Sequence, residues 1–279
     1  MKGGYGMKIP FMKMSGSGND FVLIDHRKPR VQPERMKEFA RKVCRRRVSV
    51  GADGLIFIEP SARADFMWRF FNADGSEAEM CGNGGRCAAR FAFLKGIAGS
   101  CLTFETLAGR LSAEVSGKRV KLEMTQPHGL TLDQRLVIEG KEEAIFSLNT
   151  GVPHAVLFVE DLETIDVVRL GRAIRYHAHF APQGTNVNFV RVEDDSHLSV
   201  RTYERGVEDE TLACGTGTVA SALVSAFQGK VKSPVAVKTR GGEVLTVHFE
   251  IQGKDVKKVF FEGEVHVIYE GEIWEEAYE

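Results

Sequence analysis

The sequence predicts an α+β fold made of two pseudo-symmetric halves, each built mostly from antiparallel strands. Apolar runs of strand length outnumber helical patterns several-fold. Short turn segments separate successive strand-length runs, as in β-hairpins; examples are Ser116-Gly117-Lys118 and Gly253-Lys254-Asp255. One motif also occurs twice: CGNGGRCAARFAFLKG begins at Cys81, and CGTGTVASALVSAFQG begins at Cys214. A repeated motif in a strand-rich chain indicates two halves of one design.

The expected elements follow one another along the whole chain. Apolar alternation and short apolar runs predict strands at 9–14, 21–24, 55–58, 66–71, 102–106, 111–115, 119–124, 155–159, 188–192, 198–203, 235–239, 245–249, 257–262 and 264–269. Helical periodicity predicts helices at 33–46, 82–95, 166–176 and 215–228. Turn residues in Gln126-Pro127-His128-Gly129 make this segment the linker candidate. The predicted halves are therefore residues 1–125 and residues 126–266.

Composition is typical of a globular enzyme. The chain has 279 residues, 43% apolar and 27% charged, which is enough for two buried cores. A net charge of −1 favours neither nucleic acid nor an anionic membrane as a partner. No apolar stretch approaches the ~18–20 residues of a membrane span, and no signal peptide is evident. Five cysteines without a disulfide framework predict a cytoplasmic protein. The glycine-rich residues 1–6 are expected to be disordered.

Each copy of the repeated motif predicts a reactive thiol. A Cys-Gly-x-Gly turn places the sulfur at a helix N-terminus, where unpaired N–H groups and the helix dipole favour negative charge. We expect the thiol pKa to fall below its reference of ~8.5 there. The glycine N–H groups form a site suited to a carboxylate. Cys44, Cys87 and Cys101 are interpreted as small buried hydrophobes, and the cysteine spacing does not match a zinc site, so no metal is expected.

Two such thiols suit inversion at an α-carbon. One thiolate removes the proton from one face, and one thiol delivers a proton to the other, while hydrogen bonds to the carboxylate stabilise the carbanion. The segments that precede the two motifs match in kind, Arg69-Phe70-Phe71-Asn72 and Arg201-Thr202-Tyr203-Glu204, which makes Asn72 and Glu204 equivalent. The pair titrates as a coupled unit, so the sequence does not tell which cysteine is the resting thiolate.

The chain resembles the diaminopimelate epimerase family. The resemblance lies in KMSGSGNDFVLID, VGADGLIFIEP, FFNADGSEAEMCGNGGRC, GVPHAV, GTNVNFV and YERGVEDETLACGTGT, which together extend from Lys13 to Thr218. It implies a cofactor-independent isomerase that interconverts LL- and meso-diaminopimelate for lysine and peptidoglycan synthesis. It also implies that each half is a curved sheet around a central helix, that the active site lies in the cleft between the halves, and that residues 267–279 return to the first half.

The resemblance also assigns roles to individual residues. Cys81 and Cys214 would be the acid/base pair, with His154 and Glu204 flanking the thiols and ordering the substrate amine and water. The N–H groups of Gly82, Asn83, Gly215 and Thr216 would hold the reacting carboxylate. Asn19, Asn72, Asn186 and Arg205 would bind the rest of the substrate, with Arg205 as a bidentate clamp on the distal carboxylate.

The sequence departs from the family at two positions. Val152 stands where the family often has an asparagine that contacts substrate, and Asn149 or a water would have to replace that hydrogen bond. Gly54 stands where some relatives have glutamine.

Two other functions stay open. A cysteine-pair racemase of another amino acid, such as proline or hydroxyproline, shares the chemistry but has less use for a distal clamp. A redox sensor would instead join Cys81 to Cys214 as a switch. A small-molecule substrate is the expected partner, and the sequence is compatible with a homodimer without fixing the oligomeric state.

Overall fold

A computed structural model describes residues 8–279, which form two compact units. The first unit holds the described residues up to Leu122 together with Glu264–Glu279, and the second holds Glu123–Gly263. Strands dominate both units, and most strand pairs are antiparallel, so the predicted α+β class is confirmed. The disorder expected for residues 1–6 concerns a segment outside the described residues. Within residues 8–279, no helix is both long and apolar enough to cross a membrane.

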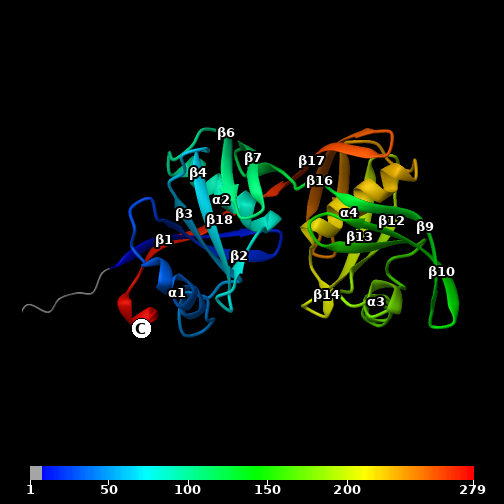
Figure 1. The fold of residues 1–279 in the computed structure, drawn as a ribbon, viewed down its shortest axis with the longest axis horizontal. Helices are drawn as coiled ribbons and strands as arrows, with labels where there is room; N and C mark the ends of the chain where they lie inside the picture. Colours follow the sequence, from blue (N-terminus) through cyan, green and yellow to red (C-terminus); the bar gives the residue numbers. More distant parts are fainter. Residues whose placement is uncertain (1–7) are drawn as a thin grey trace, which may run out of the picture. The chain divides into compact units, whose positions relative to one another are not determined.

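The first unit begins with a hairpin and ends with a strand that returns from the end of the chain (Figure 1). Its elements are β1 (Ile9–Gly16), β2 (Asn19–Asp25), η1 (Pro33–Arg35), α1 (Met36–Val43), β3 (Gly54–Glu59), β4 (Phe66–Asn72), β5 (Glu77–Ala78), α2 (Gly82–Leu94), β6 (Cys101–Thr106), β7 (Gly109–Ser116), β8 (Arg119–Glu123), β18 (His266–Ile273) and η3 (Glu275–Ala277). Strand β18 pairs antiparallel with β1.

The second unit repeats this sequence of elements. It consists of β9 (His128–Ile138), β10 (Lys141–Asn149), β11 (Pro153–Phe158), α3 (Val167–Arg175), η2 (Ala178–Phe180), β12 (Asn186–Val192), β13 (His197–Glu204), β14 (Asp209–Thr211), α4 (Gly215–Phe227), β15 (Val235–Lys238), β16 (Val244–Gln252) and β17 (Asp255–Glu264). Strand β9 takes the place of β18, because it pairs antiparallel with β10 as β18 does with β1.

Strand pairing is the same in both units. The pairs β2–β3 and β4–β6 are parallel, as are β11–β12 and β13–β15, while the neighbouring pairs are antiparallel. Parallel neighbours need a crossover, and a helix supplies each one: α1 and α2 in the first unit, α3 and α4 in the second. Helix α1 of the first unit therefore corresponds to α3 of the second, and α2 corresponds to α4.

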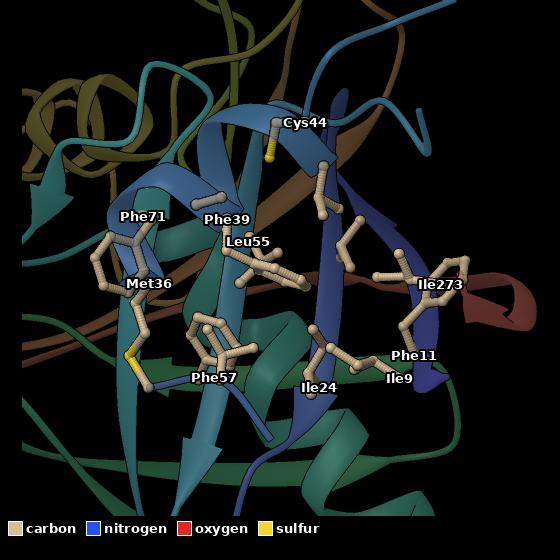
Figure 2. Close-up of a cluster of buried hydrophobic side chains, with 14 of the residues drawn as sticks. Ile9, Phe11, Ile24, Met36, Phe39, Cys44, Leu55, Phe57, Phe71 and Ile273 are labelled. Atoms are coloured by element: carbon tan, nitrogen blue, oxygen red, sulfur yellow. The ribbon is translucent and has the colours of Figure 1, made fainter. Parts of the chain in front are cut away.

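Alternate residues of the central strands face different helices. In the first unit Val22, Leu55 and Phe57 belong to the apolar cluster that also contains Met36 and Phe39 of α1, as Figure 2 shows for the labelled side chains. The other face receives α2, which contacts β1, β2 and β3 and also the more distant strand β7. The sheet therefore curves around α2.

The second unit has the same two layers. Its apolar cluster joins α3 to Ala155, Leu157, Val187, Phe189 and Tyr203, while α4 contacts β10–β13, β15 and β16. The residues that alternate with this cluster on β11, β12 and β13 therefore face α4.

Three of the four predicted helices agree with the structure to within about one residue at each end, but the first does not. The segment 33–46 begins as the turn η1, and α1 ends at Val43. The chain then turns through Arg47 and Gly51, both at φ 74°, so the predicted helix is too long.

The predicted linker extends too far: Gln126 and Pro127 lie between β8 and β9, but His128 and Gly129 already belong to the long hairpin β9–β10. The signal was present in the alternation of Leu130, Leu132, Leu136 and Ile138 and in the left-handed turn Glu139-Gly140, with φ of 51° and 84°. Half-exposed strands of this kind carry a weak apolar pattern, which is why the hairpin was missed.

The three cysteines outside the motif starts do not share one environment. Cys44 and Cys87 are buried, as predicted, and burial raises the pKa of each thiol to about 12. Cys101 is exposed, so its interpretation as a buried residue is wrong: it opens β6 at a position that faces outward.

Gly171 tests the packing of α3. A Cβ there would overlap the Cβ of Tyr203 and approach its Cγ to 2.6 Å. Alanine gains ~1 kcal/mol of helix propensity over glycine, but overpacking against an atom next to the backbone costs ~1–3 kcal/mol. We expect Gly171→Ala to lower the free energy of urea unfolding, by up to about 2 kcal/mol. Gly99→Ala, whose Cβ has its nearest neighbour at 3.9 Å, is the control, and equal effects of both variants would contradict the packing argument.

Candidate active site

Cys81 and Cys214 occupy equivalent positions, the N-caps of the 13-residue helices α2 and α4. Both have extended backbone, and each sulfur accepts a hydrogen bond from the third helical residue, Gly84 N at 3.4 Å and Gly217 N at 3.4 Å. The sequence-predicted helix starts are thus confirmed. We call the surroundings of Cys81 in the first unit the first half-site, and those of Cys214 in the second unit the second half-site.

Two asparagines of the first half-site are held in one orientation. Asn83 Nδ2 donates to Asn19 Oδ1 at 2.9 Å, and Asn83 Oδ1 accepts from Arg86 Nη2 at 2.8 Å. Asn19 Nδ2 donates to Asp53 Oδ2 at 3.1 Å. Because a guanidinium can only donate and a carboxylate only accept, these two ends fix both amides.

A charged cluster supports Asn19 from the other side. Lys13, only 5% exposed, pairs with Asp20 at 2.9 Å. Arg46 pairs with Asp20 at 2.7 Å and with Asp53 at 2.8 Å. Burial opposes the charge on Asp20, but hydrogen bonds from Arg46 and Lys13 outweigh it and lower the pKa of that carboxyl to about 2. Arg46 therefore links the two carboxylates, and Asp53 in turn accepts from Asn19.

The remaining predicted residue of the first unit, Asn72, ends β4. It is half-buried and opposite Gly54 in the β3–β4 register, and its Nδ2 donates to Ser76 Oγ at 3.0 Å. Gly54 has no space for a side chain, since a Cβ would overlap the Phe70 ring and approach Phe71 O to 2.9 Å. The departure from relatives with glutamine thus has a steric reason.

Asn186 and Arg205 lie together in the second half-site. Asn186 Oδ1 accepts from the Arg205 backbone N–H at 2.8 Å, and its Nδ2 donates to Pro153 O at 3.1 Å. The Arg205 guanidinium donates to Gln183 O at 3.1 Å, and no carboxylate of residues 8–279 pairs with it. Arg201, by contrast, forms a bidentate pair with Glu210 at 2.6 and 2.7 Å.

Val152 stands directly before Pro153, and Asn149 lies at the start of the turn that leads to it. Val152 is half-buried, and Asn149 Oδ1 accepts from Gly151 N at 2.9 Å, closing the turn that precedes β11. The Asn149 acceptor is therefore already used within the loop.

Burial governs the charge state of the second half-site. It raises the pKa of Cys214 to about 12, the Glu204 carboxyl adds to the shift, and the Thr216 hydroxyl and Gly217 N–H oppose it only in part. The lowered thiol pKa expected from the helix N-terminus is thus wrong for Cys214, because burial outweighs the dipole. Burial also raises the pKa of Glu204. In the ligand-free protein at neutral pH, Cys214 is a thiol.

His154 is neutral as well. Burial lowers its pKa to about 3, and the charge of Arg205 adds to this effect. Only 1% of the residue is exposed, and its Nδ1 lies 3.1 Å from Asn188 Nδ2.

The repeated strand register makes the two half-sites comparable residue by residue. Phe21 faces Gly54 across β2–β3 as His154 faces Asn186 across β11–β12, and Ile56 pairs with Phe70 as Asn188 pairs with Thr202. The first half-site is therefore backed by apolar side chains, and the second by polar ones. Sequence reasoning missed Asn188 and Thr202, although a second asparagine two positions after Asn186 on a buried strand was a usable signal.

The sequence matches one known protein family. The family model described as diaminopimelate epimerase matches residues 11–129 and 146–268. The chain belongs to the diaminopimelate epimerase family. It is 51% identical to the diaminopimelate epimerase of Aquifex aeolicus, over 97% of this chain and 100% of that protein. It is 47% identical to that of Archaeoglobus fulgidus, over 85% of this chain and 88% of that protein. The family consists of isomerases acting on a small molecule.

More distant proteins share the fold. A Bacillus anthracis phenazine biosynthesis protein of the PhzF family aligns with a TM-score of 0.74 at 17% identity, covering 96% of this chain and 99% of its own. A hydroxyproline epimerase from Agrobacterium vitis aligns with a TM-score of 0.70 at 15% identity, covering 96% of this chain and 93% of its own. These likenesses concern the backbone architecture alone.

The charge state of Cys214 can be measured by alkylation. Iodoacetamide reacts with the thiolate, whose fraction rises about tenfold per pH unit below the pKa. With a pKa of about 12, labelling of Cys214 in the ligand-free protein should rise about 100-fold from pH 7 to 9 without a plateau. Peptide mass spectrometry follows each site, with buried Cys44 as the unlabelled control. A plateau below pH 9 would mean that the helix N-terminus does lower the Cys214 pKa.

Proposed function

We propose that this protein epimerises diaminopimelate at one α-carbon without a cofactor, using Cys81 and Cys214 as an acid/base pair. The observation that carries the proposal is the equivalence of the two thiols, each the N-cap of a 13-residue helix in one of two repeated units. Membership of the diaminopimelate epimerase family supports the choice of substrate. The reaction would serve lysine and peptidoglycan synthesis.

The reacting carboxylate would be bound by helix N-termini. The first N–H groups of a helix have no partner within the helix and carry the positive end of its dipole. In α2 these groups belong to Gly82 and Asn83, and in α4 to Gly215 and Thr216. Charge that develops on the carboxylate during proton removal is stabilised by such donors.

Proton transfer needs one thiolate and one thiol. The thiolate takes the α-proton, the C–H electron pair moves onto the carboxylate, and the opposite thiol then gives its proton to the other face of the same carbon. After one passage the two sulfurs have exchanged roles, so the reverse reaction starts from the product state. His154 and Glu204 would flank the thiols and order the substrate amine and water.

The distal end of the substrate would be held by Arg205. Its guanidinium lacks a carboxylate partner among the described residues, whereas its neighbour Arg201 is paired with Glu210. Asn186 holds the Arg205 backbone at 2.8 Å, and Asn19 and Asn72 would complete the contacts. This free cation favours a substrate with two carboxylates over proline or hydroxyproline, which have one.

The proposal extends to the cellular compartment of the protein. All five cysteines are free of disulfides, which is in keeping with a reducing compartment, and we place the protein in the cytoplasm.

The two-thiol assignment can be tested by isotope exchange. Cys81→Ala or Cys214→Ala should reduce epimerisation in both directions by at least ~10²–10⁴-fold, the usual contribution of a general acid or base. Each variant, incubated with diaminopimelate in heavy water, should label only the isomer whose α-proton faces its remaining sulfur, so the two variants should prefer opposite isomers. Chiral chromatography with mass spectrometry measures both. Labelling of the same isomer at similar rates would assign a structural role to one cysteine.

The distal clamp can be tested with a truncated substrate. Arg205→Met should lower kcat/KM for diaminopimelate by ~30- to 4,000-fold, because a buried ionic contact is worth ~2–5 kcal/mol. Turnover of lysine, which lacks the distal carboxylate, should already be low in the unaltered protein and should not fall further in the variant. An equal loss for both substrates would instead indicate that Arg205 only supports the fold.

A further inference from the structure

Three polar side chains lie buried on adjacent strands beneath the start of α4. They are His154 on β11, Asn188 on β12 and Thr202 on β13, exposed by 1%, 0% and 4%. The equivalent positions of the first unit hold Phe21, Ile56 and Phe70. The two half-sites therefore share a scaffold but differ in the groups behind the thiol. Burying a polar group is costly unless its hydrogen bonds are satisfied. Each contact among these side chains should therefore join a donor to an acceptor, which allows the hydrogen positions to be assigned.

The orientation of the Asn188 amide is determined by its surroundings. Its Nδ2 lies 3.0 Å from the carbonyl oxygen of Ala155, which can only accept. The amide nitrogen must therefore be on that side, and Asn188 Oδ1 is left to accept from the Thr202 hydroxyl at 3.0 Å. A flipped amide would place two acceptors against each other.

This orientation decides where the proton of His154 lies. Asn188 Nδ2 is also 3.1 Å from His154 Nδ1. A donor faces Nδ1, so Nδ1 must be the bare acceptor, and the single proton of the neutral ring is on Nε2. With Nδ1 occupied and Nε2 protonated, His154 has no site at which to act as a base.

The Nε2–H group is left without an acceptor. His154 Nε2 is buried and has no hydrogen-bond partner within residues 8–279. A buried donor without an acceptor costs ~1–3 kcal/mol. The other polar atoms of the network, by contrast, are paired. Because the rest of the network is paired, the unpaired Nε2–H group of His154 indicates a position at which a ligand atom can accept a hydrogen bond.

We propose that Asn188 is a positioning residue: it fixes His154 as the neutral Nε2–H tautomer, so that His154 donates to an anionic acceptor in the second half-site. The acceptor is either a substrate carboxylate or the Cys214 thiolate formed during turnover. This inference deepens the proposed epimerase function and rests on it for the identity of the acceptor, but not for the tautomer.

Gly217 provides independent support for the place of Asn188. A Cβ at Gly217 would overlap Asn188 Oδ1 and approach Cys214 Sγ to 3.2 Å. At the equivalent Gly84 a Cβ would meet Ile56 Cδ1 at 3.4 Å, an ordinary contact. The Asn188 amide thus packs directly against the turn that carries the thiol, which Ile56 does not do as closely in the first unit.

The tautomer is measured directly by long-range ¹H–¹⁵N NMR on protein labelled at the histidine ring nitrogens, with His154→Gln to assign the resonances. In the unaltered ligand-free protein, His154 should carry its proton on Nε2 and should not titrate between pH 6 and 9. A proton on Nδ1, or an imidazolium in that range, would overturn the proposal without any variant at Asn188.

Variants at Asn188 test the cause. In Asn188→Asp a carboxylate faces Nδ1, so the proton should move to Nδ1. In Asn188→Leu no donor or acceptor faces it, so the single tautomer should be lost. Ile56→Leu, the equivalent position of the first unit, is the control and should leave the His154 spectrum unchanged. A persistent Nε2–H tautomer in folded Asn188→Asp would show that Asn188 is not the determinant.

The acceptor is identified with LL-diaminopimelate as the probe. A shift of His154 Nε2 on addition that persists in Cys214→Ala indicates the carboxylate, and a shift lost in that variant indicates the thiolate. No shift in either protein would refute donation to an anion.

Catalysis gives the last readout. Asn188→Asp should reduce kcat by about 10- to 100-fold with little change in KM, as removal of an outer partner of a functional histidine does in metal sites. If the His154 proton lies on Nδ1 in Asn188→Asp and kcat is unchanged, the tautomer has no role in turnover. If the unaltered protein turns over no diaminopimelate, the proposed function fails, whereas the tautomer result stands on its own.

Discussion

The hydrogen bond from a helix N–H group to a thiol sulfur is the interaction on which each unit depends. Gly84 and Gly217 donate to Cys81 and Cys214 at 3.4 Å, and at Gly217 the second unit packs so closely that a Cβ would overlap Asn188 Oδ1. The sheet curves around the same helix, which anchors its first turn. A thiol placed this way is fixed in direction by the whole unit, and not by a loop, which gives the precision that proton transfer needs.

The two half-sites share a backbone arrangement but differ in the side chains that orient their amides. The first half-site orients its amides with full charges, Arg86 at one end and Asp53 at the other. The second orients its amide with a backbone carbonyl and a hydroxyl. The groups that orient the amides are therefore charged in the first half-site and neutral in the second, although the two half-sites share one backbone design.

Sequence patterns predicted the parts of this protein that depend on local periodicity. The helices after Cys81 and Cys214 were placed correctly, because alanine-rich apolar segments have a clear 3.6-residue period. The hairpin β9–β10 was missed because half-exposed strands carry little apolar contrast. The pKa of Cys214 was predicted in the wrong direction, since the helix terminus is visible in the sequence but the burial that dominates it is tertiary. Asn188 escaped notice for the same reason: its partners come from two other strands.

The two helix starts depart from the usual residue preferences in the same way. Ser, Thr, Asp and Asn are the residues that stabilise an N-cap, and glycine inside a helix costs ~0.5–1 kcal/mol relative to alanine. Both helices nevertheless begin with cysteine and place glycine at the first and third positions, Gly82 and Gly84 in one and Gly215 and Gly217 in the other. Local rules broken twice in the same way are expected at functional sites and not at structural ones. The burial of each helix within its sheet offsets this cost, so a central helix enclosed by strands is what makes a thiol-capped, glycine-rich start tolerable.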